Sequence, residues 1–303
     1  MKAAAVAETM ARDAVEAPAR RGPSVVAGLI GRGIQLSRTP AMQEAAGARL
    51  GMRFVYQLLD ADIMGDPQPD LATILRAAEL CGFAGVNVTY PFKRQVIPLL
   101  DVLSDAAQRV GAVNTVVFRH GKRFGHNTDC WGFAESFRRG MPGVATSAVL
   151  LIGAGGAGGA VAHALLDCGV ERILVFDIEP ASADALVRSL NMRAGGKCLA
   201  GRVDDLAAAA RAADGIVNAS PVGMAKLPGL PIPADLIAPR HFVADVVYFP
   251  LETELLKAAR EKGCRVLPGS GMALFQAVRA FELFTGVKPD VAAMQETFDS
   301  FAR

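Results

Sequence analysis

Short apolar runs alternate along the chain with longer stretches in which apolar residues recur at helical spacing. SVVAGLIG (24–31) and RFVYQLLD (53–60) are rich in Val, Ile and Leu and have the length of strands. The stretch 39–52 follows the first run and 69–82 follows the second, each with apolar residues three and four positions apart. The pattern therefore predicts two consecutive strand–helix units.

The helix predicted over 39–52 carries a start signal, because Thr39 can act as its N-cap. After the second helix, GVNVTY (85–90) predicts a third strand. The segment that follows Pro91 predicts a helix, and GAVNTVVF (111–118) predicts a return to strand.

A second series of apolar runs occupies the rest of the chain. Its predicted strands are 147–153, 172–177, 214–220, 241–248 and 264–269. Helical patterns lie between them, over 157–168 and 251–262 for example. Regular strand–helix alternation favours an α/β fold with mainly parallel sheets covered on both faces.

The length of 303 residues suggests roughly two domains of ordinary size. The polar turn GHNTD (125–129) separates the two series, and we place the boundary there. We expect residues 23–128 to form one domain and residues 129–271 to form the other. The Ala-rich residues 1–22 are expected to be a disordered or loosely helical tail.

Composition narrows the class of protein. Hydrophobic residues make up 51% of the chain, and the formal net charge is +2, without a dense Lys/Arg block, which argues against nucleic-acid binding. No run of 18 residues is free of polar interruption, so we expect no membrane span. Acidic residues at Glu8, Asp13 and Glu16 argue against a targeting peptide, and we expect a cytoplasmic protein.

The cysteines fit the same compartment. The chain has five, at 81, 130, 168, 198 and 264, and none forms a CxxC pair. An odd number of scattered cysteines favours reduced thiols. Because the cysteines and the four histidines lack the spacing of metal ligands, we expect no metal site.

A glycine-rich segment, LLIGAGGAGGAVAHALL (150–166), suggests a nucleotide site. Gly153, Gly155 and Gly158 form the pattern GxGxxG between a predicted strand and a predicted helix. The first glycine allows a sharp turn, the second lets a pyrophosphate approach the backbone, and the third lets the helix pack on the strand. The free N–H groups of the helix N-terminus then face the phosphates.

Asp177 ends the next predicted strand, 19 residues after Gly158. An acidic residue about 20 positions on is expected to bind the adenosine ribose hydroxyls. Its carboxylate repels a 2′-phosphate, and no arginine follows before Arg188, so we expect NAD rather than NADP. The alternative is that Asp177 only caps a helix.

Polar side chains gather at predicted strand and loop ends in the first half of the chain. They combine hydroxyls and amides with one amine and one carboxylate, a set suited to binding a polyhydroxylated ring and moving a proton. They are Ser37, Thr39, Asn87, Thr89, Lys93, Asn114 and Asp129. Simpler interpretations exist for several of them: Lys93 could be a solvated surface residue, and Thr39 and Asp129 could be helix caps.

These motifs resemble those of the shikimate/quinate dehydrogenase family, in the family's order and from about residue 26 to 300. They are GLIGRGIQLSRTP, NVTYPFK, GAVNT, GHNTD, GAGGAGGA, NASPVGM, DVVY and GMALFQA. The resemblance implies a substrate-binding domain (23–128), a Rossmann-type NAD-binding domain (129–271), and a cleft between them. It also implies that the last helices, within 272–303, return to the first domain.

The resemblance also implies roles for individual residues. Lys93 and Asp129 would be the catalytic pair. The substrate would be bound by Ser37, Thr39, Thr89, Asn114, Asp129, Tyr248 and Gln276, with the first two on its carboxylate. The cofactor would be bound by Gly153, Ala154, Gly155, Gly156, Ala157, Gly158, Asp177, Ser220, Val222, Gly223, Met224, Val247 and Gly271. Gln276 could instead be a core amide, and His126, a tempting base, has no role in the family.

Three features differ from the common biosynthetic pattern and resemble the NAD-dependent quinate/shikimate branch, which can act in quinate breakdown. Leu36 stands where His is common, Gln43 replaces another His, and the acceptor strand ends in Asp177 rather than Asn-Arg-Thr. We expect an enzyme that accepts quinate or shikimate. A dehydrogenase specific for shikimate or an amino-substituted analogue, and a non-catalytic sensor of such acids, are the alternatives. The sequence leaves monomer and homodimer open.

Overall fold

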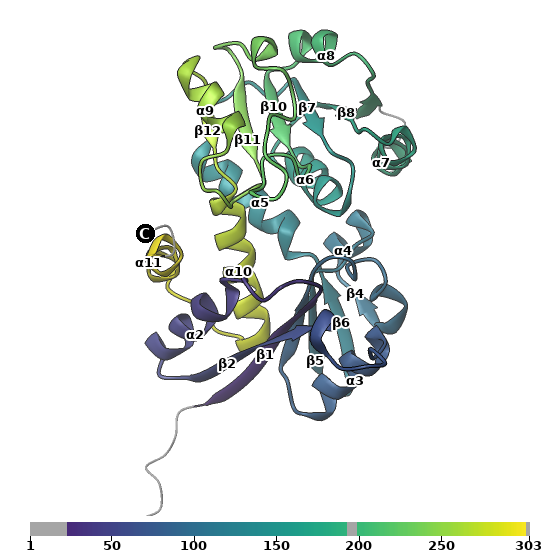
Figure 1. Cartoon of the computed structure of the whole chain (residues 1–303), viewed down its shortest axis with the longest axis vertical. Helices are drawn as coiled ribbons and strands as arrows, with labels where there is room; N and C mark the ends of the chain where they lie inside the picture. Colours follow the sequence, from purple (N-terminus) through teal and green to yellow (C-terminus); the bar gives the residue numbers. More distant parts are fainter. Residues whose placement is uncertain (1–22, 193–198, 301–303) are drawn as a thin grey trace, which may run out of the picture.

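Two six-stranded sheets, one in each half of the chain, organise the structure, which is a computed structural model (Figure 1). It describes residues 23–192 and 199–300. The tail predicted over 1–22 lies outside the described residues. Each sheet carries its own helices, as the two strand–helix series predict, and the two-domain α/β fold is confirmed.

The first sheet is only partly parallel. In spatial order it contains β2 (Arg53–Asp60), β1 (Ser24–Gly31), β3 (Gly85–Val88), β5 (Thr115–Arg119), β6 (Lys122–His126) and β4 (Val102–Leu103). β1 and β2 have the predicted bounds, and β1 is parallel to both of its neighbours. β5 runs antiparallel to β3 and to β6, so a hairpin stands where the alternation predicts parallel strands. We call this sheet with its helices the first lobe.

Within the described residues, the first lobe has three α-helices: α2 (Thr39–Arg49), α3 (Leu71–Leu80) and α4 (Asp105–Val110). The prediction that Thr39 caps α2 is wrong. Arg38 holds the N-cap position, Thr39 is the first helical residue, and no side chain caps the helix. The Thr39 hydroxyl is therefore not used by its own helix.

The helix predicted after Pro91 is also wrong. This segment forms turns and then a short 3-10 helix, η2 (Ile97–Leu99). The carbonyl of Lys93 accepts a hydrogen bond from the N–H of Val113 at 2.8 Å, so it is used outside the segment. Pro98 has no N–H with which to continue an α-helix.

The second sheet is entirely parallel. Its spatial order is β12 (Arg265–Leu267), β11 (Phe242–Asp245), β10 (Gly215–Asn218), β7 (Ala148–Ile152), β8 (Arg172–Phe176) and β9 (Ala200–Arg202). Its helices are α6 (Gly156–Asp167), α7 (Pro180–Met192), α8 (Leu206–Ala212) and α9 (Glu254–Glu261). We call this part the second lobe. The direction of winding reverses between β7 and β10, the place where such folds bind nucleotides.

Two helices join the lobes. α5 (Thr128–Gly140) and α10 (Ser270–Thr285) pack against each other between the two sheets (Figure 1). α10 continues into the first lobe, where Phe281 stacks on Phe54, and α11 (Val291–Ser300) packs on α2. The expected return of the C-terminal helices to the first lobe is confirmed.

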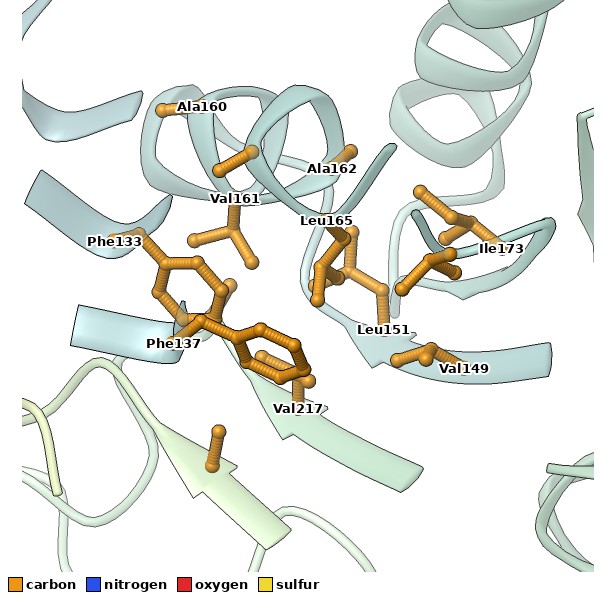
Figure 2. Close-up of a cluster of buried hydrophobic side chains, with 14 of the residues drawn as sticks. Phe133, Phe137, Val149, Leu151, Ala160, Val161, Ala162, Leu165, Ile173 and Val217 are labelled. Carbon is orange, nitrogen blue, oxygen red and sulfur yellow. The ribbon is translucent and has the colours of Figure 1, made fainter. Parts of the chain in front are cut away.

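The core of the second lobe fixes these elements in place. Phe133 and Phe137 of α5 and Leu165 of α6 are buried against Leu151 of β7 and Val217 of β10 (Figure 2). Burial of large apolar side chains stabilises such an arrangement by about 1.5–3 kcal/mol each. The loop between β7 and α6 is therefore attached at both ends to elements that are packed in this core.

Candidate active site

One pocket of about 240 Å³ lies between the lobes. It brings together every residue predicted for catalysis or substrate binding: Ser37, Thr39, Thr89, Lys93, Asn114, Asp129, Tyr248 and Gln276. Ala157 of the glycine-rich segment lines it as well. These residues come from both lobes and from α10, so only the tertiary fold assembles them.

A close ion pair lies in this pocket. The Nζ of Lys93 is 2.6 Å from the Oδ2 of Asp129. Their side chains are 24% and 11% exposed, so Lys93 is not the solvated surface residue of the simpler interpretation. Asp129 does not cap α5 either, because the side chain of Asn127 accepts the N–H of Cys130 as the cap. Both groups are available to a ligand.

The charges of Lys93 and Asp129 act on the phenol of Tyr248. Although Tyr248 is 47% exposed, partial desolvation of its phenol raises its pKa; the Lys93 ammonium lowers the pKa and the Asp129 carboxylate raises it. The net pKa is above the ordinary value, so the hydroxyl is protonated and can donate a hydrogen bond at neutral pH.

Two amides in the pocket are held in fixed orientations. The Oδ1 of Asn114 accepts the N–H of Thr128 at 2.7 Å, and its Nδ2 donates to the hydroxyl of Thr128 at 2.9 Å. The Nδ2 of Asn87 donates to the hydroxyl of Thr115 at 2.8 Å, and its Oδ1 accepts the hydroxyl of Tyr56 at 2.7 Å. Asn87, a member of the predicted polar set without an assigned role of its own, lines the pocket as well. Its place in NVTYPFK was the available signal.

Ser37 lies on the loop between β1 and α2, and Thr39 is the first residue of α2. The N–H of Thr39 donates to the Oγ of Ser37 at 3.3 Å, and the N–H of Ser37 donates to the carbonyl of Ile34 at 2.9 Å. This turn places both hydroxyls at the pocket, where a carboxylate could accept from them.

Asp60 anchors this loop, and sequence reasoning missed it. Its carboxylate is 1% exposed and accepts from the N–H groups of Gly33, Ile34 and Asp62 and from the side chain of Gln35, at 3.0–3.1 Å. Burial pushes the pKa of Asp60 up, but the bond from Gln35 and the three backbone bonds outweigh it and hold the pKa below its usual range. Its only sequence signal was its place at the end of β2.

Thr89 and Gln276 complete the lining of the pocket. A Cβ on Gly31 would lie 2.4 Å from the Cγ2 of Thr89, so Thr89 fits here only because residue 31 is glycine. Gln276 is half-buried on α10, and its Nε2 donates to the carbonyl of Ala273 at 3.0 Å. Since it faces the pocket, it is not a fully enclosed core amide.

The glycine-rich loop has the geometry that a dinucleotide needs. Gly153 has a φ of +103°, and a Cβ there would lie 2.7 Å from the backbone nitrogen of Ser220. A Cβ on Gly158 would lie 2.1 Å from the carbonyl oxygen of Gly153, which requires glycine for close packing of α6. Around Gly155 and Gly156 the same position is open, and no side chain caps α6. Phosphates therefore fit at this helix N-terminus.

Asp177 follows β8 and faces the same loop. Its Oδ2 accepts the N–H of Ala154 at 2.6 Å, and its Oδ1 accepts the N–H of Glu179 at 2.8 Å. α7 begins three residues later, at Pro180, so the carboxylate stabilises the glycine-rich loop rather than serving only as a cap. Its predicted contact with an adenosine ribose stays a prediction.

The other predicted cofactor residues are distributed around the ends of β10 and β11. Ser220 and Val222 are bonded to the side chain of Asn218, and Gly223 has a φ of +102°. The N–H of Val247 donates to Asp245 at 2.9 Å. Met224, on the loop after β10, is 43% exposed.

Gly271 lies apart from this group, in the first turn of α10. A Cβ there would come within 2.2 Å of the Oγ of Ser136. Its absent side chain therefore permits the packing of α10 on α5, and its predicted contact with a cofactor stays a prediction.

His126 does not line the pocket. Burial, and then the charges of Arg279 and Arg119, lower its pKa. The imidazole is therefore neutral at pH 7, outside the acid–base pair.

Several kinds of site are absent from residues 23–192 and 199–300. Within them no three His, Cys, Asp or Glu side chains cluster as metal ligands. No helix there has the length and apolar character needed to cross a bilayer. Cys81, Cys130, Cys168 and Cys264 are free thiols, and Cys198 lies outside the described residues.

Two family models match the chain. Residues 29–116 match the shikimate dehydrogenase substrate binding domain, and residues 269–297 match the shikimate 5′-dehydrogenase C-terminal domain. The first match covers the loop of Ser37, the strand before Lys93 and Asn114. The second covers all of α10 and the first part of α11.

Curated relatives are similar over nearly the whole chain. A shikimate dehydrogenase (NADP(+)) of Streptomyces avermitilis is 50% identical over 272 residues, which are 89% of this chain and 94% of the relative. A quinate/shikimate dehydrogenase (NAD(+)) of Corynebacterium glutamicum is 46% identical over 280 residues, which are 91% of this chain and 98% of the relative. Similar relatives therefore differ in the cofactor that their names carry.

Solved structures give the same picture. Quinate dehydrogenase from Corynebacterium glutamicum in complex with NAD has a TM-score of 0.88 and 47% identity, covering 92% of this chain and all of that one. Shikimate 5-dehydrogenase from Thermus thermophilus in complex with NADP(H) and shikimate has a TM-score of 0.80 and 35% identity, covering 91% and 99%.

Proposed function

We propose that this chain, which belongs to the shikimate dehydrogenase family, oxidises quinate and shikimate with NAD, using Lys93 and Asp129 as its acid–base pair. Membership of the family makes it an oxidoreductase with a nicotinamide cofactor. The proposal adds the choice of cofactor, the range of substrates and the roles of the residues. It assigns substrate binding to 23–128 together with 272–303, and cofactor binding to 129–271.

The observation that carries the proposal is that one pocket is lined both by the ion pair and by Ala157 of the glycine-rich loop. A ring bound among the hydroxyls and amides would present its reacting alcohol to Lys93 and Asp129. Bound NAD would supply the acceptor for the hydride.

The chain's own groups would handle the proton. Asp129 keeps the Lys93 amine within 2.6 Å of its carboxylate, so the amine is oriented before substrate binds. The substrate hydroxyl would donate its proton to this pair as the carbonyl forms. In the reverse direction, the Lys93 ammonium would donate to the ketone oxygen. Proton transfer by a positioned side chain contributes about 10²–10⁴-fold to a rate.

Asp177 supports NAD as the cofactor. Its carboxylate lies at the end of β8 and is already bonded to the N–H of Ala154. A 2′-phosphate would have to approach this negative charge, and the residues from Ile178 to Ser182 include no cation. NAD, which has a free 2′-hydroxyl, could bond to the carboxylate instead.

Both acids suit the pocket chemically. Each carries a carboxylate that Ser37 and Thr39 could bind and ring hydroxyls for the amide and carboxylate groups. Quinate has one additional hydroxyl on the carbon that bears the carboxylate, next to Thr39. A shikimate-specific enzyme that uses NADP is the second candidate, favoured by the name of the relative that is 50% identical.

The test is a steady-state comparison of quinate and shikimate, each with NAD and with NADP. We expect turnover of both acids with NAD, at a kcat/KM at least about tenfold above that with NADP, which corresponds to about 1.4 kcal/mol. A preference for NADP would reject the cofactor assignment. Turnover of shikimate alone would select the second candidate for the substrate.

A further inference from the structure

A buried carboxylate connects the two loops that close the second lobe's side of the pocket. Asp245 ends β11, is 2% exposed, and lies beside Asn218, the last residue of β10 and its partner in the parallel register. Neither residue lines the pocket. Their side chains do, however, bond to the chain segments that carry the predicted contacts.

Asp245 accepts three hydrogen bonds from three different segments. Its Oδ1 accepts the Nδ2 of Asn218 and the N–H of Val247, both at 2.9 Å. Its Oδ2 accepts the hydroxyl of Thr253 at 2.7 Å. Every partner is a donor, so the site requires two acceptor oxygens, as a carboxylate provides.

One of these bonds leads to the loop after β10. The same Nδ2 of Asn218 donates to the carbonyl of Val222 at 2.9 Å, and the Oδ1 of Asn218 accepts the hydroxyl of Ser220 at 2.7 Å. A Cβ on Gly223 would lie 3.8 Å from the Oδ2 of Asp245, so this loop lies directly over the carboxylate. Asp245 thus orients the loop through Asn218.

The other bonds lead to the loop after β11. Val247, whose N–H donates to Asp245, directly precedes Tyr248, which lines the pocket. Thr253 closes the far end of this loop, because its Oγ1 also accepts the N–H of Leu256 and caps α9. The carboxylate therefore fixes the loop at both of its ends.

We propose that Asp245 is a positioning residue that sets the nicotinamide side and the substrate side of the pocket together, acting through Asn218, Val247 and Thr253. The inference rests on the proposed function, which assigns cofactor binding to 129–271. This range includes the loop after β10, where the family resemblance implies that Gly223 and Met224 contact the nicotinamide end of the cofactor. The two loops share one anchor, so displacing it would misplace the reacting atoms relative to each other, which can slow hydride transfer about 10²-fold.

The test is Asp245→Asn, which keeps the volume of the side chain and replaces one acceptor oxygen with a donor. We expect kcat for quinate and shikimate to fall about tenfold to a hundredfold. Binding of ADP-ribose, which lacks nicotinamide, should stay within about twofold of the wild type, because it uses Asp177 and the glycine-rich loop instead. The primary deuterium isotope effect on kcat, with the carbinol carbon labelled, should increase.

Matched variants separate positioning from loss of folding. Thr253→Val removes the hydroxyl and should reproduce part of the fall in kcat, whereas Thr253→Ser keeps the hydroxyl and should restore it. Asp214→Asn is the control at the opposite end of β10, where Asp214 accepts the N–H of Ala148 at 3.0 Å. It should leave kcat unchanged.

Three outcomes would overturn the inference. One is wild-type kcat in Asp245→Asn. Another is a fall in kcat matched by an equal loss of ADP-ribose binding sites, with the isotope effect unchanged, which would indicate unfolding. In both of these cases the wild type still turns over, so the proposed function stands. A wild type that oxidises neither acid would contradict the proposed function and this inference with it.

Discussion

Lys93 and Asp129 are ordinary charged residues, and their position in the pocket is what gives them the proposed acid–base role. Replacing Lys93 with Met keeps most of the side-chain length but removes the amine, so the substrate hydroxyl loses its proton acceptor. We expect kcat to fall by about 10²–10⁴-fold. The affinity for shikimate, measured by titration, should change only a few-fold, because the other polar groups of the pocket remain.

Lys122 provides the control for this substitution. It is an exposed lysine at the start of β6, so Lys122→Met removes the same charge far from the proposed chemistry. Its kcat should equal that of the wild type. Turnover of Lys93→Met at the wild-type rate would refute the assigned role.

Asp177 gives a prediction about cofactor choice. Asp177→Asn removes the charge that faces a 2′-phosphate but keeps an oxygen for the N–H of Ala154. Two charges about 4 Å apart in water interact by about 1 kcal/mol, so the ratio of kcat/KM for NADP over NAD should increase about fivefold. Steady-state kinetics with both cofactors measure this ratio. The exposed Glu179 allows a matched control, and an equal effect of Glu179→Gln would show that only the net charge matters.

The loop between β1 and α2 depends on a single buried carboxylate. Asp60→Asn leaves some of its four donors unpaired and should destabilise the protein by about 2–4 kcal/mol at pH 7. The loop carries Ser37 and leads directly into Thr39 at the start of α2, so KM for both acids should increase. Denaturant unfolding and steady-state kinetics measure the two effects.

The same carboxylate gives this stability a defined pH dependence. The pKa of Asp60 is lower in the folded protein than in the unfolded chain, where aspartate titrates at about 3.9. Its contribution is therefore present above about pH 4 and is lost as the pH falls through the folded pKa. The unfolding free energies of the wild type and Asp60→Asn should converge below that pH. The control Asp62→Asn, an exposed partner of Arg32, should change little at any pH.

The periodic pattern of apolar residues predicted those strands and helices in which the apolar residues are buried in a core. β1 and β2 have the predicted bounds because their apolar residues face the core of the first lobe. β6, whose sequence is KRFGH, was missed because its polar residues give no apolar run. It forms through pairing with β5, across a turn in which His120 and Gly121 both have positive φ. That pairing depends on the tight turn and not on an apolar run.

The candidate site likewise contains residues that the sequence predicted and residues that it missed. Residues that line the pocket stand in recognisable motifs, so the sequence could name them. Asp60 and Asp245, which hold the loops, were missed because their bonds join segments that are distant along the chain. An aspartate at a strand end has many possible partners, and only the assembled sheets select among them.

The two lobes meet through α5 and α10, whose backbones lie close together at Gly132. A Cβ there would lie 2.7 Å from the backbone nitrogen of Gln276 and 2.9 Å from the carbonyl oxygen of Met272. Gly132→Ala must therefore push the helices apart, at an expected cost of about 1–3 kcal/mol. Since Met272 and Gln276 also line the pocket, KM for quinate and shikimate should increase along with the loss of stability.

Gly159 supplies a control at the other contact between the lobes. It lies in α6, and a Cβ there would be 3.6 Å from the Cγ1 of Val110 in α4, an ordinary packing distance. Gly159→Ala should therefore stabilise the helix by up to about 1 kcal/mol and leave KM unchanged. If thermal unfolding and kinetics showed the same small effect for both substitutions, the separation of α5 and α10 would not control the pocket. Opposite signs in stability, with KM altered only in Gly132→Ala, would mean that the packing of these two helices sets the geometry in which the lobes present their groups to the substrate.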